Sequence, residues 1–98
     1  MSRELWFHPD TEAELTEALD FYAQQGPGLD RRFVPEFEHA LEQIVRFPEA
    51  AAPLHGRLRR KLLPSYPCSL IYRLTDTQIR VLAVAHQKRR PFYWRTRS

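Results

Sequence analysis

Three strands are predicted by residues 57–86, whose sequence is RLRRKLLPSYPCSLIYRLTDTQIRVLAVAH. Residues 68–75 (CSLIYRLT) and 78–86 (QIRVLAVAH) are rich in branched and aromatic side chains, and Asp76-Thr77 between them suits a tight turn. Both segments carry apolar residues on both faces near their middles, which is typical of strands inside a sheet. We therefore expect these two strands to form a hairpin in the interior of a β-sheet.

The segment before this hairpin, residues 57–63, is expected to be a strand with one cationic face. Its residues alternate, so two leucines should point one way and three cations the other: Leu58 and Leu62 against Arg57, Arg59 and Lys61. Cations also protect exposed sheet edges from aggregation, so the segment has a second interpretation as a solvated edge strand.

A short strand and a first helix are predicted near the N-terminus. Residues 3–8 alternate in a way that suits a strand. Thr11 and Glu14 then form a capping box, in which the Thr11 hydroxyl accepts the N–H of Glu14 and the Glu14 carboxylate reaches back. Apolar residues follow at helical spacing, and Gly26-Pro27 should end the helix at about Gln25.

A second helical pattern runs from Leu29 to Phe47. Either this helix begins near Arg31, so that Pro35 lies close to its start, or it kinks at Pro35. Residues 48–56 (PEAAAPLHG) are expected to be a loop, because they are bounded by prolines and closed by glycine.

The order strand, helix, helix and three strands (β-α-α-β-β-β) predicts an α+β fold. We expect one domain over residues 1–98, in which a helical hairpin packs on one face of a small, mainly antiparallel sheet. No internal repeat is visible in the sequence.

Positive charge is concentrated in the second half of the chain. Residues 57–98 contain eleven Lys or Arg and one acid, whereas residues 1–56 contain four basic residues and eleven acids. The net charge of +3 thus combines about +10 with about −7. Such a one-sided field favours polyanions or an acidic protein as partners.

Composition excludes several other classes of protein. A single cysteine, Cys68, leaves no internal disulfide and fits a reducing compartment. No apolar run approaches the roughly 18 residues of a membrane span, and the N-terminal residues lack a signal peptide's apolar core. The histidines lack ligand spacing. We expect a cytoplasmic protein with no membrane association, no metal and no cofactor.

Four motifs follow one another: a helix ending in Phe47-Pro48, RLRRKLL at 57–63, YPCSLIYRL at 66–74, and the closing pattern H-x-x-R-x-P-x-Y-W formed by His86, Arg89, Pro91, Tyr93 and Trp94. In this order and spacing they resemble the RelE/ParE superfamily of bacterial toxins from type II toxin–antitoxin modules. The resemblance implies a RelE/ParE-like fold and a toxin that arrests growth. It also implies a cognate acidic antitoxin that neutralises the toxin in a hetero-oligomer.

The resemblance leaves two kinds of target open, because one branch of the superfamily cleaves messenger RNA in the ribosome and another inhibits DNA gyrase. RNA cleavage needs proton transfer and cations that stabilise the charge on the phosphate. For that reaction the candidate catalytic residues are His86, Arg89 and Tyr93. The residues expected to bind RNA or another target are basic or aromatic: Arg57, Arg59, Arg60, Lys61, Arg73, Lys88, Arg90, Trp94 and Arg95.

Two departures from the ribonuclease branch favour the gyrase interpretation slightly. Ser69 and Leu62 stand where that branch usually carries basic residues. Other interpretations stay open. They are His86 as a structural residue at a strand end, Tyr93-Trp94 as packing of the tail onto the sheet, and the whole chain as a non-toxic basic nucleic-acid-binding module.

Overall fold

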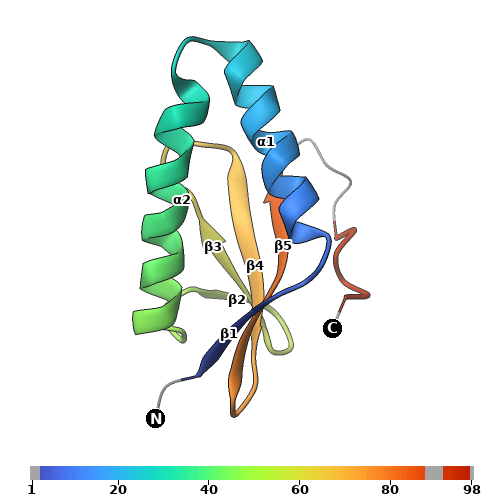
Figure 1. Cartoon of the computed structure of the whole chain (residues 1–98). Helices are drawn as coiled ribbons and strands as arrows, with labels where there is room; N and C mark the ends of the chain where they lie inside the picture. Colours follow the sequence, from blue (N-terminus) through green and yellow to red (C-terminus); the bar gives the residue numbers. More distant parts are fainter. Residues whose placement is uncertain (1–2, 88–91, 98) are drawn as a thin grey trace.

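Two helices cover one face of a five-stranded sheet (Figure 1). The computed structural model describes residues 3–87 and 92–97. The elements are β1 (Glu4–Phe7), α1 (Thr11–Gln25), α2 (Leu29–Arg46), β2 (Ala52–His55), β3 (Leu58–Leu62), β4 (Cys68–Leu74) and β5 (Gln78–His86). The strand order is β1-β5-β4-β3-β2, with β1 parallel to β5 and the other pairs antiparallel. The predicted α+β fold with a mainly antiparallel sheet is confirmed.

The predicted hairpin of β4 and β5 lies in the interior of the sheet. Leu70 and Tyr72 are fully buried in the core beneath the helices, while Ile71 and Ala83 are fully buried in a second cluster. Because both faces of this hairpin are covered near its middle, residues 70–72 and 81–85 are apolar on both sides of the sheet.

The prediction of a loop over residues 48–56 is wrong in part. Ala52–His55 form β2, which pairs antiparallel with β3. Gly56, in the turn between the two strands, has a φ of 58°, a conformation that glycine adopts without steric cost. Since β2 takes the edge of the sheet, β3 is an interior strand and not a solvated edge.

On β3, Leu58 and Leu62 lie on the face of the sheet opposite the helices. Leu62 is 61% exposed and lies opposite Ser69 of β4. Arg59 is half-buried and donates to the carbonyls of Glu49 and Ala51 at 2.9 and 2.8 Å. An arginine can do this because its aliphatic stem covers apolar surface while its guanidinium reaches polar atoms.

The predicted capping box does not form at the start of α1. Asp10 is the N-cap residue, and the Thr11 hydroxyl donates to the carbonyl of His8 at 2.7 Å. The Glu14 carboxylate accepts the N–H of Val84 in β5 at 2.9 Å. Thr11 and Glu14 both lie on the buried side of the helix, so their side chains bind groups outside it. The predicted end of this helix at Gln25 is confirmed.

Of the two alternatives for Pro35, a helix start near Arg31 is wrong. The helix begins at Leu29, after Gly28 with a φ of 77°, and Pro35 therefore lies inside it. Proline removes the donor that would bind the carbonyl of Arg31. Both Pro35 and Arg31 are exposed, so this carbonyl lies on the outer side of the helix.

Aromatic rings form the centre of the core between the helices and the sheet. Phe33 of α2 is fully buried and stacks on Tyr22 and Phe37, with ring centroids 5.3 and 6.0 Å apart. Tyr66 meets Phe33 edge-on at 5.0 Å and donates its hydroxyl to the carbonyl of Leu29. This cluster fixes the helical hairpin on the sheet.

The opposite face of the sheet, here called the open face, is covered in part by residues 92–97, here called the C-terminal turn. Trp94 in this turn is 5% exposed and packs with Ile71 of β4 and Ala83 of β5. The structure thus shows Trp94 packing the tail onto the sheet, as one of the two interpretations of Tyr93-Trp94 expected.

We predict that Tyr72→Phe destabilises the fold modestly. The Tyr72 hydroxyl donates to the carbonyl of Pro48 at 2.6 Å and ties the end of α2 to β4. Its removal should lower the free energy of unfolding by about 1 kcal/mol. Urea unfolding of the two proteins measures the difference, and an unchanged midpoint would contradict a stabilising role for this bond.

Candidate functional site: a hollow on the open face

A hollow of about 380 Å³ lies beside the C-terminal turn. Strands β2 to β5, the link between β3 and β4, and the turn itself supply its walls: Leu54, Arg60, Leu62, Tyr66, Pro67, Cys68, Ser69, Ile71, Ala85, His86, Gln87, Phe92, Tyr93 and Trp94. Most of these side chains are apolar or aromatic. Among the residues that the structure describes, Arg60 is the one lysine or arginine in the lining.

Alternation along β3 and β4 builds one wall of the hollow. Arg60 lies opposite Ile71, and Leu62 lies opposite Ser69. Residues that face each other across antiparallel strands share one side of the sheet. The two positions at which the sequence departs from the ribonuclease branch, Leu62 and Ser69, are therefore neighbours on this wall, and both are neutral.

The C-terminal turn builds the opposite wall. Phe92 has a φ of 59°, a value uncommon for a residue other than glycine, and its side chain is 53% exposed. Its ring meets that of Trp94 edge-on at 5.6 Å. Backbone hydrogen bonds from Arg95 to Phe92 and from Arg97 to Trp94 close the turn. The result is an exposed aromatic ring supported by a buried one.

His86 borders the hollow at the end of β5 and also belongs to the aromatic cluster beneath α1. It lies opposite Cys68 in the sheet. Its ring is 4.8 Å from that of Phe21 and 5.6 Å from that of Tyr22. The residue is therefore held by packing on its helix side.

Two ionisable groups near His86 are neutral at physiological pH. Burial raises the pKa of the Cys68 thiol to about 12 and that of the Tyr22 hydroxyl to about 12. The thiolate is the reactive form of cysteine, so burial keeps this thiol unreactive. Cys68 acts as a small core residue.

We predict that the stability of the protein falls in alkaline solution. A raised pKa favours the protonated form in the folded state, so the contribution of Cys68 is complete below pH 9, its unfolded pKa, and is lost as the pH rises toward 12. The free energy of unfolding should fall by up to about 1.4 kcal/mol per pH unit just above pH 9.

Urea unfolding at pH 7, 9 and 10 measures this dependence. Cys68→Ala is the control, because it removes the thiol and leaves Tyr22, whose contribution is lost only above its unfolded pKa of 10. The slope between pH 9 and 10 should be smaller in Cys68→Ala; equal slopes in the two proteins would show that Cys68 does not titrate on unfolding.

The structure brings four of the predicted site residues together around the hollow: Arg60, His86, Tyr93 and Trp94. Three others predicted from the sequence, Lys88, Arg89 and Arg90, lie outside the described residues.

The remaining predicted cations lie away from the hollow. Arg59 binds carbonyls beside the end of α2, and Lys61 lies near that end with Phe47 and Tyr72. Arg57 is exposed at the turn between β2 and β3, Arg73 lies opposite Leu58, and Arg95 is exposed on the C-terminal turn.

Sequence reasoning missed the apolar part of the lining. Leu54 lies in a segment that was predicted to be a loop. Phe92 immediately precedes Tyr93-Trp94, the aromatic pair of the closing motif. Ile71 and Ala85 belong to strands that are apolar on both faces, so alternation could not show which of their residues border an open surface.

Within residues 3–87 and 92–97, no three His, Cys, Asp or Glu side chains gather as a metal ion would require. Neither helix combines the length and apolar character needed to cross a membrane.

Known proteins resemble this chain in sequence and in fold. Residues 5–91 match the family described as ParE toxin of the type II toxin-antitoxin system parDE. Toxin ParE2 from Mycobacterium tuberculosis, in strains CDC 1551 / Oshkosh and H37Rv, is 34% identical over 92 residues, which span 93% of this chain and 88% of the relative.

A solved structure shares the fold. The structure titled "Chromosomal ParDE TA system from P. aeruginosa" matches with a TM-score of 0.75 at 19% identity, over 87% of this chain and 96% of that one. The helical hairpin on a five-stranded mixed sheet is thus a fold that this solved structure shares. This chain belongs to the ParE toxin family of type II toxin–antitoxin systems.

Proposed function

We propose that this toxin arrests growth by binding DNA gyrase through the hollow on its open face, without cutting RNA. The observation that carries the proposal is the neutral pair Leu62 and Ser69 on the wall of the hollow. Cleavage of RNA requires cations around the reacting phosphate, and neither side chain supplies one. A largely apolar hollow with Arg60 at its wall suits an apolar protein segment that carries an acidic residue.

The environment of His86 supports a binding role as well. A general acid or base must reach the proton that it transfers. The ring of His86 packs against Phe21 and Tyr22 beneath α1, an arrangement typical of a structural residue at the end of a strand.

The proposal includes an acidic antitoxin that neutralises the toxin in a cytoplasmic hetero-oligomer. The opposed charges of the two halves of the chain support it, because an acidic partner is attracted to the cationic second half. The structural neighbour is part of a ParDE system by its title, which supports the same kind of partner here.

The alternative of a ribosome-dependent messenger ribonuclease is tested by adding purified, antitoxin-free protein to ribosomes that translate a defined messenger. Primer extension then maps the RNA ends. We expect intact messenger from a preparation that arrests cells. New ends in translated codons, lost in His86→Ala, would establish the ribonuclease, and a preparation that arrests no cells would support a non-toxic nucleic-acid-binding module.

A further inference from the structure

The second half of β5 has an open edge within the described structure. β1 pairs with β5 only from Gln78 to Val81, and the last backbone contact is the N–H of His8 with the carbonyl of Val81. Beyond it, a bulge in the pairing of β5 with β4 leaves Leu82 as an extra residue. The backbone groups on this edge need other partners, because an unpaired buried N–H or C=O is destabilising.

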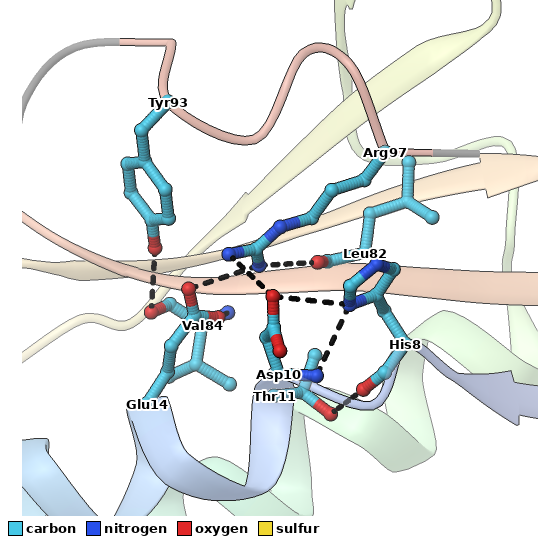
Figure 2. Close-up of polar contacts among 8 residues, drawn as sticks. All are labelled: His8, Asp10, Thr11, Glu14, Leu82, Val84, Tyr93 and Arg97. Carbon is cyan, nitrogen blue, oxygen red and sulfur yellow. Dashed lines mark hydrogen bonds and ion pairs between the residues drawn. The ribbon is translucent and has the colours of Figure 1, made fainter.

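Side chains take the place of the missing strand, as Figure 2 shows. Glu14 of α1 accepts the N–H of Val84 at 2.9 Å. Tyr93 donates its hydroxyl to the carbonyl of Val84 at 3.2 Å, and Arg97 donates to the carbonyl of Leu82 at 2.9 Å. Two segments at opposite ends of the chain thus bind the same edge of β5.

The same side chains form a buried ion pair. The Arg97 guanidinium lies 2.9 Å from Glu14 and 3.4 Å from Asp10, and it also lies over the ring of Tyr93. The side chains of Glu14 and Arg97 are only 4% and 13% exposed. Loss of either partner removes the nearest opposite charge from a buried charged group, which is much worse than removing both.

These contacts hold the segment that forms one wall of the hollow. Phe92 and Trp94 belong to the same short turn as Tyr93 and Arg97, and six residues are too few to keep a conformation without tertiary contacts. The backbone bonds that close the turn do not attach it to the sheet. Attachment comes from the packing of Trp94 and from the bonds of Tyr93 and Arg97 to β5.

We propose that Glu14, Tyr93 and Arg97 are positioning residues for target binding, because they dock the C-terminal turn on the open edge of β5 and so create the hollow. This inference rests on the proposed use of the hollow as the surface that contacts the target. Glu14 and Arg97 do not line the hollow, so neither needs to touch that target, whereas Tyr93 also lines it. Glu14 belongs to α1 and holds the turn indirectly, through its contacts with Arg97 and with the N–H of Val84.

Three variants separate this role from a general loss of stability. Glu14→Gln keeps an acceptor for the N–H of Val84 and removes the charge that pairs with Arg97. Arg97→Met removes the guanidinium. Arg97→Lys keeps a charge for Glu14 but cannot also bind Asp10 and the carbonyl of Leu82, because an ammonium lacks the planar fork of a guanidinium.

Two readouts are measured for each variant. Survival after induced expression reports toxicity whatever the target. Acrylamide quenching of Trp94 fluorescence reports the turn, in a Trp6→Phe background that leaves Trp94 as the only tryptophan. Tyr72→Phe is the matched control, because its lost hydrogen bond lies near the end of α2, away from the turn.

We expect Glu14→Gln and Arg97→Met to fold, to expose Trp94 to quencher and to raise survival by about 100-fold, with Arg97→Lys between them and the wild type. Tyr72→Phe should keep full toxicity and a protected Trp94. If Arg97→Met fails to fold, the double variant Glu14→Gln/Arg97→Met tests the positioning role instead, because it removes both charges of the pair. This double variant should fold and be non-toxic.

Folded Glu14→Gln and double variants with full toxicity, or with Trp94 as protected as in the wild type, would overturn the inference. Survival is scored without reference to gyrase, so failure of the proposed target leaves this test unaffected. Conversely, wild-type protein that inhibits gyrase together with a fully toxic double variant would retain the proposed function and reject the positioning role.

Discussion

Arg60→Glu is expected to abolish growth arrest in a protein that stays folded. Arg60 is exposed on β3, and it is the one lysine or arginine in the lining of the hollow among the residues described. Charge reversal at the centre of an interface replaces attraction by repulsion, and central arginines often contribute 2 kcal/mol or more, a factor of about 30 in affinity. The fold should tolerate the change because the side chain is exposed.

Growth arrest and a thermal unfolding curve are measured together for this variant. Arg31→Glu is the matched control, since Arg31 is also exposed but lies on α2, on the other face of the sheet. The control should remain toxic. Full toxicity in folded Arg60→Glu would remove the hollow from consideration as the target-binding surface.

Phe33→Ala is expected to have the largest effect on stability. Phe33 is fully buried and contacts the rings of Tyr22, Phe37 and Tyr66. Truncation of a buried phenylalanine removes apolar contacts and leaves a cavity, at a cost of about 3 to 5 kcal/mol. Since small domains are stable by about 5 to 15 kcal/mol, the variant should be close to unfolding at physiological temperature.

Urea unfolding measures this loss, with Phe47→Ala as the control. Phe47 follows α2 and is 59% exposed, so its truncation should change the free energy of unfolding by less than about 1 kcal/mol. Similar losses for the two variants would contradict the assignment of the aromatic cluster as the centre of the core.

The central hairpin and both helices could be predicted because their signals are local. The branched and aromatic residues of 68–75 and 78–86 gave strands close to those observed, and Gly26-Pro27 marked the end of α1 correctly. β2 was missed because its composition, Ala-Pro-Leu-His, is poor in strand formers. The feature that could have revealed β2 was the short connection with Gly56 that leads into β3, as in a hairpin.

The network at the edge of β5 could not be predicted from its parts. Glu14 fits a capping box in the sequence, but in the folded chain its carboxylate meets Val84 and Arg97, residues that are 70 or more positions away. One hint was available: Glu14 shares a stripe of α1 with the buried residues Ala18 and Tyr22. A carboxylate at such a position implies a buried partner, without saying which one.

The lining of the hollow was predicted only in part, because the sequence does not show which strand faces lie on the same side of the sheet. Arg60, His86, Tyr93 and Trp94 were selected by chemical type and motif, and they do line it. Alternation along residues 57–63 could not show which face of β3 the helices would cover. Register with β4 does: it places Leu62 beside Ser69 on the open face and Arg59 opposite Tyr72, a core residue.

Inhibition of gyrase by the purified toxin tests the central claim most directly. Antitoxin-free wild-type protein and the Arg60→Glu variant are titrated into a supercoiling reaction that contains gyrase, ATP and relaxed plasmid. We predict that the wild type blocks supercoiling and that the variant needs at least about 30-fold more protein for the same effect. Normal supercoiling in the presence of wild-type protein that arrests cells would contradict gyrase as the target.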